Sequence, residues 1–454
     1  MKRVVVVGAG LSGLAAAYRI REAVPGVHLT VLEEAARPGG NIWTERRDGF
    51  TVEYGPNGVF DAKPHALRLV RDLGLGADLV PGSEDARKNR FLALGGRLQM
   101  LPGSPLGILT TPILSPLARL RLLAEPFQRR PGNLPADESV ASFARRRFGR
   151  EAADTFVDGL VTGIHGGDPE QLSLAAAFPR LATFERESGS VLRGMMRSAK
   201  QRRRDAASRG EKPSPQRMWS FRPGLRFFVE ALAASLGASL KLGVGMRRLE
   251  RTADGWQVFG DGTDAWPADV VVLTTPAHRQ AELLSFDDEL AALVAGIRSN
   301  RIAVVALGYR ASDVRGRQDG FGFIAPQNTR RDVLGVQWCS SVFPERAPPG
   351  FVMWRALCGG VHRGELLDLS DDDLVRKVHA ELVPLMGVTA APAFVQVVRW
   401  PRAIPQYVVG HPARVAAIEA KASRWPGLIL AGTGYRGVAL NDCCEQAEMI
   451  ARKF

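Results

Sequence analysis

The first residues of the chain have the types and spacing of a nucleotide-binding loop. An apolar run, Val4–Val7, leads directly into a Gly-x-Gly-x-x-Gly pattern. In such a loop the first glycine permits a tight turn, the second lets backbone approach a pyrophosphate, and the third lets helix and strand pack closely. The helix that follows offers unpaired N–H groups to phosphate oxygens. The loop residues expected at a dinucleotide are Gly8, Ala9, Gly10, Leu11, Ser12 and Gly13.

An acidic residue completes this pattern. Glu33 closes the next strand-like run, Val27–Leu32, about 20 residues after the loop, where a carboxylate accepts hydrogen bonds from ribose hydroxyls. Glu34 is a second candidate for this contact, although we expect its side chain to face solvent.

Further glycine-rich segments favour a flavin over a nicotinamide nucleotide. Arg37-Pro38-Gly39-Gly40 follows the acid, where a flavin needs close passage of the backbone. Near the other end, Gly432-Thr433-Gly434-Tyr435 closes the last strand and Asn441 opens the last helix. The start of that helix can hold negative charge that develops on a reduced flavin. A simple nicotinamide dehydrogenase has no use for a second cofactor motif at this end.

Composition places the chain among folded, enzyme-sized proteins. It has 454 residues, of which 45% are hydrophobic and 24% charged, so collagen-like, coiled-coil and disordered classes are excluded. The formal net charge of +13 suits an anionic partner. We expect no nucleic acid, because the basic residues lack interleaved aromatic side chains. We expect no metal, because His and Cys are not at ligand spacing. Free thiols are expected at Cys339, Cys358, Cys443 and Cys444, with the last two structural.

Hydrophobic periodicity outlines the elements that position these motifs. A helix is expected at 64–73, and helical patterns follow at 139–148 and 151–161. A helix from Phe227, a hairpin at Asp261-Gly262 and strands at 270–275 and 427–431 belong with the glycine motifs. Four more strands are expected, with a helix among them at 371–385: 302–307, 333–338, 351–357 and 394–398.

Two segments point toward a surface role. Residues 98–118 carry no charge but contain four prolines, so they are too broken to span a bilayer. Residues 195–222 are rich in Arg, Lys, Ser and Pro, which predicts a mobile basic surface loop. Together they could dip into one leaflet and meet anionic headgroups. The first apolar run leads straight into the glycine motif, so we expect no secretory leader.

The sequence resembles a known family. The blocks GAGLSG and RPGG mark a superfamily of monoamine oxidases and phytoene desaturases. The blocks YGPNG, NRFL, GFGFIAP and GVALNDC resemble the FAD-dependent, oxygen-dependent protoporphyrinogen oxidases within it. This resemblance implies an α/β fold: a discontinuous Rossmann-like FAD-binding domain, a mixed-sheet substrate domain and an inserted helical membrane-associating domain. The implied boundaries are 1–88, 219–290 and 400–454 for the first, 291–399 with 89–97 for the second, 98–204 for the third, and a basic linker at 205–218.

The implied reaction is the oxidation of protoporphyrinogen IX to protoporphyrin IX, a step of heme biosynthesis. It needs three two-electron steps, each with hydride transfer to N5 of a non-covalent FAD, and it passes electrons to O₂ to give hydrogen peroxide. No side chain is expected to be catalytic, because the cofactor carries the chemistry. By resemblance, Arg90 pairs with a substrate propionate, and Phe321, Gly322, Ile324 and Leu357 line the cavity around the macrocycle.

The resemblance also extends the set of cofactor contacts beyond the first loop. Met246 stands where relatives usually have a valine whose backbone meets the adenine, and at Asn57 only the backbone is assigned. The further cofactor-binding residues are Gly40, Asn41, Gly55, Pro56, Asn57, Gly58, Met246, Trp400, Gly432, Val438, Ala439 and Leu440.

Several alternatives stay open at this point. A coproporphyrinogen III oxidase would share these motifs, and four propionates would favour a more basic cavity. A flavin amine oxidase is disfavoured because residues 400–407 contain no cysteine for flavin attachment. The remaining alternatives are a carotenoid-type desaturase and a non-catalytic porphyrin-binding protein. The expected partners are the tetrapyrrole and O₂, with peripheral membrane contact, a homodimer and hand-off to the next heme-pathway enzyme. The expected location is the cytoplasm, at a membrane.

Overall fold

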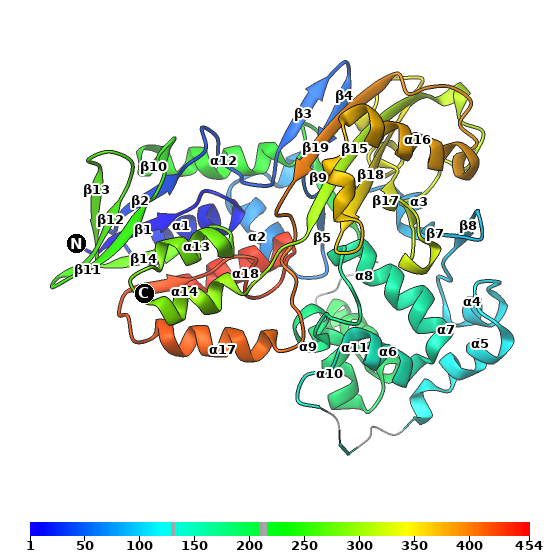
Figure 1. Cartoon of the computed structure of the whole chain (residues 1–454), viewed down its shortest axis with the longest axis horizontal. Helices are drawn as coiled ribbons and strands as arrows, with labels where there is room; N and C mark the ends of the chain where they lie inside the picture. The colour runs from blue at the N-terminus through cyan, green and yellow to red at the C-terminus, as the bar shows by residue number, and fades with distance from the viewer. Residues whose placement is uncertain (129–131, 134, 209, 211–215) are drawn as a thin grey trace. The chain divides into compact units, whose positions relative to one another are not determined.

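The computed structural model describes residues 1–128, 132–133, 135–208, 210 and 216–454. The chain forms two compact units, each built from separated segments (Figure 1). The first unit contains Met1–Gly82, Arg217–Ser299 and Ala413–Phe454. The second contains Ser83–Gln216 and Asn300–Pro412. Both ends of the chain therefore belong to the first unit.

A five-stranded parallel sheet forms the centre of the first unit. Its strands are, in spatial order, β10 (Leu240–Leu242), β2 (His28–Glu33), β1 (Arg3–Val7), β14 (Val270–Leu273) and β20 (Leu428–Leu430). Strand β1 is apolar throughout because both of its faces are covered. Val4 and Val6 pack on one side of the sheet, and Val5 and Val7 pack on the other.

Helices cover the two faces of this sheet. One face packs against α1 (Leu11–Ala23), α2 (His65–Asp72), α12 (Arg226–Leu236) and α18 (Leu440–Ala451). The other packs against α13 (Ala277–Leu283), α14 (Asp288–Ala295) and α17 (His411–Ala422). Helices α1 and α18 lie side by side (Figure 1). The predicted βαβ start, the middle strand and the last strand and helix are thereby confirmed.

Three small antiparallel sheets complete the first unit. The predicted hairpin at 261–262 joins two strands of a three-stranded sheet. The strands of these sheets are β11 (Arg248–Thr252), β12 (Gly255–Phe259) and β13 (Ala265–Ala268); β3 (Thr44–Arg47) and β4 (Phe50–Glu53); β5 (Val59–Phe60), β9 (Met218–Phe221) and β6 (Leu79–Pro81).

A seven-stranded mixed sheet dominates the second unit. Its spatial order is β19 (Phe394–Trp400), β15 (Arg301–Arg310), β18 (Phe351–Gly360), β17 (Val333–Gln337), β16 (Gly322–Ile324), β7 (Phe91–Leu94) and β8 (Arg97–Met100). All neighbours are antiparallel except β16 and β7. We call the face that packs against α16 (Asp371–Met386) the core face, and the opposite one the second face. The predicted strands and the helix at 371–385 are confirmed.

The rest of the second unit is mostly helical. Its helices are α3 (Glu84–Lys88), α4 (Pro105–Thr110), α5 (Pro116–Leu123), α6 (Val140–Phe148), α7 (Arg150–Ala152), a π-helix (Ala153–Val157), α8 (Asp158–His165), α9 (Leu174–Ala177), α10 (Pro179–Ser188), α11 (Val191–Ser208) and α15 (Cys339–Val342). Buried Glu125 anchors the start of α11, since it accepts hydrogen bonds from Ser190 Oγ (2.6 Å) and Val191 N (3.0 Å).

The prediction of a loop over residues 195–222 was wrong for most of that segment. Helix α11 continues to Ser208, and β9 begins at Met218. The many Arg and Lys residues correctly predicted surface exposure. They did not predict a loop, because Arg and Lys are also good helix formers. Residues 209 and 211–215 of the expected basic linker lie outside the described residues. Among the described helices, none has the length and apolarity needed to cross a membrane.

Candidate functional site

The glycine loop between β1 and α1 has the geometry that its sequence predicts. Gly8 adopts φ +101°, a conformation that disfavours other residues. A side chain at Gly13 would collide with the carbonyl oxygen of Gly8, so this glycine allows α1 to lie close to the strand. A side chain at Gly10 would meet nothing within 4 Å. The open space therefore lies beside the second glycine, where the start of α1 has no side-chain cap.

Glu33 is held at the edge of this loop. Its Oε2 accepts a hydrogen bond from Ala9 N (2.6 Å), and its Oε1 accepts one from Ala35 N (3.0 Å). Glu34 differs, because its exposed carboxylate forms ion pairs with Arg279 (3.1 Å) and Arg247 (3.4 Å). The structure therefore places the first carboxylate, and not the second, against the glycine loop.

The next glycine-rich segments meet the same loop. Gly39 N donates to Ala9 O (2.7 Å), and Gly39 pairs with Gly10 in a parallel bridge. Gly40 has φ +57°, and a side chain there would lie 3.3 Å from the Cα atom of Gly10. A side chain at Gly55 would collide with the carbonyl oxygen of Asn41. Residues from three predicted cofactor segments thus lie together around one open space.

Two side chains of the first unit have buried polar atoms with no hydrogen-bond partner in the described part of the chain. Asn57 is 6% exposed, and neither atom of its side-chain amide is hydrogen-bonded. The hydroxyl of Thr275 is also unpaired, and a side chain at Gly8 would lie 3.1 Å from the Thr275 methyl group. Buried polar groups usually find a partner, so both fit the edge of a site for a polar ligand. Sequence reasoning missed the side chains of Asn57 and Thr275.

The C-terminal motif belongs to the same unit. Gly432 adopts φ +109° after β20, and its N–H donates to Gln446 Oε1 (3.2 Å) on α18. At the start of α18, Asn441 accepts a hydrogen bond from Ala66 N (3.0 Å) and donates to Phe60 O (2.6 Å). The predicted contact residues just before this point, Val438, Ala439 and Leu440, are half-buried or exposed.

A buried glutamine joins the ends of β14 and β20. Gln280 Nε2 donates to Thr275 O (2.6 Å) and Ala431 O (2.9 Å), and its Oε1 accepts from the Tyr435 hydroxyl (2.6 Å). Burial raises the pKa of Tyr435, so this hydroxyl stays a donor. Sequence reasoning missed Gln280, because one glutamine in a helix forms no recognisable pattern.

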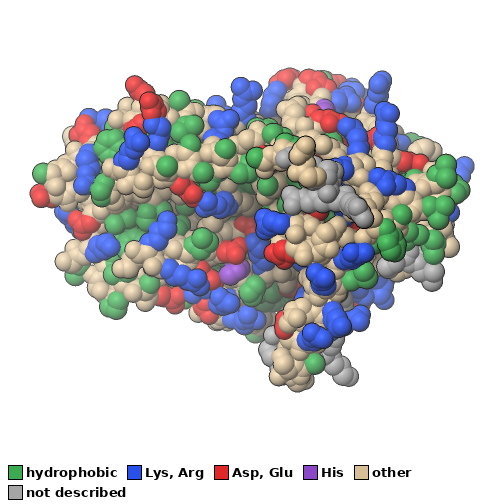
Figure 2. Space-filling model, turned by 90° about the horizontal axis from the view of Figure 1, so that it is seen from below, with side chains coloured by type: hydrophobic (Ala, Val, Ile, Leu, Met, Phe, Trp, Pro, Cys, Tyr) green, Lys and Arg blue, Asp and Glu red, His purple; other side chains and the backbone are tan. Residues whose placement is uncertain are grey.

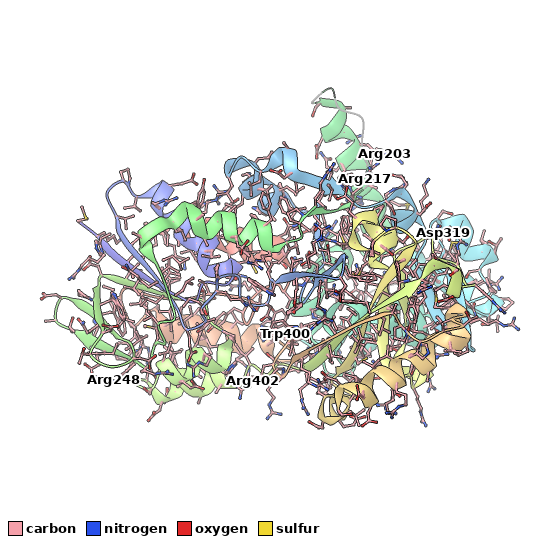
Figure 3. The ribbon with its side chains drawn as sticks, turned by 90° about the horizontal axis from the view of Figure 1, so that it is seen from above. Arg203, Arg217, Arg248, Asp319, Trp400 and Arg402 are labelled. Carbon is pink, nitrogen blue, oxygen red and sulfur yellow. The ribbon has the colours of Figure 1, made fainter. Side chains whose placement is uncertain are left out.

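The cradle in the first unit fits a dinucleotide such as FAD. It combines an uncapped helix start, an open space at Gly10, a carboxylate at the strand end and unpaired buried polar atoms. Met246 lies next to this region with its side chain packed in the core. Trp400, the remaining predicted cofactor contact, belongs to the second unit, where it ends β19 on the second face (Figure 3).

Two of the predicted substrate residues, Ile324 and Leu357, share the second face of the seven-stranded sheet. Leu357 pairs with Gly335, Gly335 with Ile324, and Ile324 with Leu92, so the four form one row across neighbouring strands. Residues in such a row point to the same side of a sheet. Their strand neighbours Ala356, Val336, Phe323 and Phe91 belong to the core face. The register of the strands therefore brings Ile324 and Leu357 together.

Arg90 and Phe321 directly precede β7 and β16, the two strands at this end of the row. The Arg90 guanidinium carbon is 5.0 Å from the centre of the Phe321 ring. The residue keeps accessible surface, while surrounding protein atoms partly desolvate the guanidinium and lower its pKa. Gly322 has φ +128°, and a side chain there would collide with the Val336 carbonyl oxygen, so only glycine fits.

Helix α8 covers part of the second face and was not predicted to belong to the site. A side chain at Gly163 would lie 2.5 Å from Ile324 Cδ1, and one at Gly159 would lie 3.3 Å from Leu92 Cδ2. At the start of this helix, Asp158 accepts a hydrogen bond from Gln327 N (2.6 Å), and burial raises its pKa to about 6. At its end, burial lowers the pKa of His165 to about 4.

The cysteines are structural. All four are free and buried. Burial raises the pKa of Cys443 to about 11, so the thiol stays protonated at neutral pH and is a poor nucleophile. Within the described residues, no group of three or more His, Cys, Asp or Glu side chains has the arrangement of a metal site.

Comparison with known sequences places the chain in a family. The description "flavin containing amine oxidoreductase" belongs to the family whose pattern matches residues 11–453. The chain is 30% identical to the coproporphyrinogen III oxidase of Bacillus subtilis, with 98% of this chain and 96% of that protein covered. It is 32% identical to the chloroplastic protoporphyrinogen oxidase 1 of Arabidopsis thaliana, with 98% and 86% covered.

Solved structures show the same fold. A candidate protoporphyrinogen oxidase from Exiguobacterium matches with a TM-score of 0.84 and 26% identity, over 100% of this chain and 98% of that one. A putrescine oxidase variant matches with a TM-score of 0.70 and 17% identity, over 100% and 99%, which supports the fold alone. These matches and the cradle described above indicate a flavin-dependent oxidoreductase. The chain belongs to the flavin containing amine oxidoreductases, in the group that includes the protoporphyrinogen and coproporphyrinogen III oxidases.

Proposed function

We propose that the chain oxidises a porphyrinogen to the aromatic porphyrin, with O₂ as the final acceptor and H₂O₂ as the product. Protoporphyrinogen IX is the substrate expected from the sequence, and coproporphyrinogen III is the second candidate. The observation that carries the proposal is the row of side chains on the second face from Leu357 to Leu92, with Arg90 two residues before Leu92. This surface combines an apolar strip with a guanidinium at its end, as a flat macrocycle with charged edges requires.

The residues of the chain have binding and orienting roles in this proposal. When bound, FAD supplies a two-electron acceptor that oxygen can re-oxidise. The backbone around Gly10 and the start of α1 hold the pyrophosphate, and Glu33 accepts from the ribose. Arg90 binds a propionate through its forked donors, which match a carboxylate in geometry. Ile324 and Leu357 contact the apolar macrocycle and exclude water from it.

The flavin is proposed to be non-covalently bound. Covalent attachment through cysteine would require a thiol near the proposed site, and residues 400–407 contain none. Denaturation of the purified protein should therefore release free FAD. Flavin that stays with the denatured chain on gel filtration would contradict this.

Peripheral membrane contact is proposed for the helical part of the second unit. Leu117 and Phe127 are 80% and 81% exposed, and Met195 and Met196 are exposed on α11. Several arginines on α11 are also exposed, and Figure 3 marks Arg203 among them. Lys and Arg side chains outnumber Asp and Glu on the face shown in Figure 2. Apolar anchors flanked by cations suit an anionic bilayer surface.

Flotation with vesicles tests this membrane contact. We expect co-migration with anionic vesicles at low salt, and loss of co-migration in the variant Leu117→Ser with Phe127→Ser. No co-migration of the unaltered protein would end the proposal. Cytoplasmic location, homodimer formation and hand-off to the next enzyme stay predictions from the resemblance.

Product formation tests the proposed reaction. Purified protein is mixed in air with protoporphyrinogen IX or coproporphyrinogen III, and porphyrin fluorescence and peroxide are followed together. We expect porphyrin and peroxide to appear at a ratio of one to three, because each of the three two-electron steps reduces one O₂. Turnover of putrescine or benzylamine in the same peroxide assay, without porphyrin formation, would favour an amine oxidase instead.

A further inference from the structure

The five-stranded sheet of the first unit has an open edge at β20. This strand is the last in the spatial order, so only one of its edges is paired, with β14. Ala431 N donates to Leu273 O (2.9 Å), which fixes the side that faces β14. Because the backbone groups of a strand point alternately to its two edges, the N–H and C=O of Leu430 point away from β14. In the described part of the chain, neither group has a hydrogen-bond partner on that outer side.

A cavity of about 430 Å³ lies along this open edge. This volume is typical of ligand-binding cavities, which measure about 300–1,000 Å³. Residues of β20, α17 and α18 line it, and these two helices are orange and red in Figure 1. Because α17 packs on one face of the sheet and α18 on the other, a cavity lined by both helices lies at the edge between them. The cofactor contacts predicted from the sequence are not among its lining residues.

The lining of the cavity is apolar beside the strand and charged at the rim. Ile418 of α17 and Met449 of α18 bring apolar side chains to the two sides of β20. Glu419 is neutralised by Arg436, at 2.6 Å. Lys453 is exposed, and no described residue forms an ion pair with it. The rim therefore has one unneutralised positive charge, which suits an acidic group on a ligand.

The opposite edge of the same sheet is built differently. Its last strand, β10, carries an exposed lysine, Lys241, at the centre of its three residues. Charged side chains on an edge strand are a common protection against pairing with another chain. β20 has the sequence Leu-Ile-Leu and no charge. An edge strand that is apolar and adjoins a cavity favours the addition of a further strand, which is a recurring mode of peptide binding.

We propose that this cavity binds an extended segment of a partner protein, which adds to β20 as a sixth strand. Backbone groups of the segment pair with the N–H and C=O of Leu430. Its apolar side chains point alternately toward α17 and α18, and an acidic residue of the segment binds Lys453. A second copy of β20 cannot take this place, because in each copy the edge lies between two helices. This proposal goes beyond the oxidation reaction and does not depend on it.

Binding of a fluorescent peptide to the FAD-loaded protein tests this proposal. The probe has four alternating valine and isoleucine residues followed by two glutamates, and fluorescence anisotropy gives its Kd. A second peptide is N-methylated at two adjacent apolar residues, so that a methyl group faces each edge of the strand. We expect saturable binding of the first peptide and at least about 10-fold weaker binding of the second, because strand hydrogen bonds are lost. Hydrogen exchange at Leu430 N–H should slow in the first complex.

Matched variants at the two edges of the sheet locate the peptide. Met449→Glu places a charge beside the apolar side chains of the peptide and should weaken its binding about 10-fold. Leu242→Glu, on β10, is the control and should leave the Kd unchanged. Lys453→Glu should weaken binding of the glutamate peptide about 3- to 10-fold and favour a peptide that ends in two lysines, whereas Lys241→Glu should do neither. Flavin content and Tm are recorded for every variant.

Three results would overturn the proposal. Absence of saturable binding up to about 1 mM peptide would remove the site. Equal binding of the N-methylated peptide would show adsorption of apolar side chains rather than strand addition. Equal losses in the variants of the two edges, or none in either, would place the peptide elsewhere on the protein. Porphyrinogen turnover is measured separately, so failure of this proposal and failure of the proposed function are distinguishable.

Discussion

The two faces of the seven-stranded sheet differ in their side chains, although the same strands form both. On the core face, α16 buries Leu374, Val378, Leu382 and Met386 against apolar strand residues. On the second face, the alternate residues of the same strands include Arg355, Gln337 and half-buried Leu357. Because successive side chains of a strand point to opposite sides, one register can serve stability on one face and the proposed ligand binding on the other.

The largest difference should come from truncating one large side chain on each face. Trp354→Ala leaves a cavity in the core face, so we expect it to lower the free energy of unfolding by about 3–5 kcal/mol. Leu357→Ala on the second face removes a half-buried side chain and should cost about 1–2 kcal/mol. Urea unfolding measures both. Porphyrin binding should weaken in Leu357→Ala and stay normal in the folded fraction of Trp354→Ala. Equal destabilisation with unchanged binding in both would contradict the division of the faces.

The next effect concerns Arg90 at the edge of the second face. Arg90→Ala should raise the KM for porphyrinogen by about 10- to 100-fold, because a charged hydrogen bond to a propionate is lost, and should leave flavin content unchanged. Steady-state kinetics and absorbance of released FAD measure the two quantities. Arg97→Ala, which removes an exposed arginine from nearby β8, is the matched control and should change neither. Unchanged kinetics for Arg90→Ala would remove this residue from the site.

A third prediction concerns the buried carboxyl of Asp158 on α8, the helix that covers the second face. Burial raises its pKa to about 6, whereas in the unfolded chain an aspartate titrates near pH 4. The folded state therefore binds this proton more tightly. Its contribution to stability is complete below about pH 4 and is lost as the pH rises through 6.

Asp158→Asn should remove this dependence. The neutral amide can still accept the hydrogen bond from Gln327 N. Relative to the unaltered protein, we expect the variant to be more stable at pH 8 by about 2 kcal/mol and not at pH 4. Denaturant unfolding at both pH values measures this. Asp154→Asn, one helical turn earlier, is the control. A stability difference that does not change with pH would show that Asp158 titrates normally.

The smallest predicted effect tests the contact between α8 and the second face. In Gly163→Ala the new methyl group would lie 2.5 Å from Ile324 Cδ1, a flexible end that can rotate away. Stability should change by less than about 1 kcal/mol, because alanine also favours the helix. Porphyrin affinity should fall a few-fold, since Ile324 moves. Gly159→Ala meets Leu92 at 3.3 Å and should have less effect on affinity. Equal porphyrin affinities for the two variants would show that Ile324 does not contact the porphyrin.

The sequence predicted local elements well and their long-range arrangement less well. Buried parallel strands such as β1 and β14 appear as short apolar runs, and the spacing of Gly8, Gly10 and Gly13 fixes a strand, a turn and a helix. The basic stretch around α11 led to the wrong prediction of a loop, because composition indicates surface exposure and not backbone conformation. The row from Leu357 to Leu92 could not be predicted, since it depends on the register of four strands, of which β7 lies far from the other three in the chain. Gln280 is a single residue without a motif, and only its hydrogen-bond partners reveal a role.

Anaerobic mixing of the purified, FAD-containing protein with a porphyrinogen tests the central claim most directly. The claim is that the chain holds one FAD and uses it to oxidise a porphyrinogen. We expect the flavin absorbance near 450 nm to bleach as porphyrin forms, and to return when air is admitted. A flavin that stays oxidised with both porphyrinogens would contradict the account.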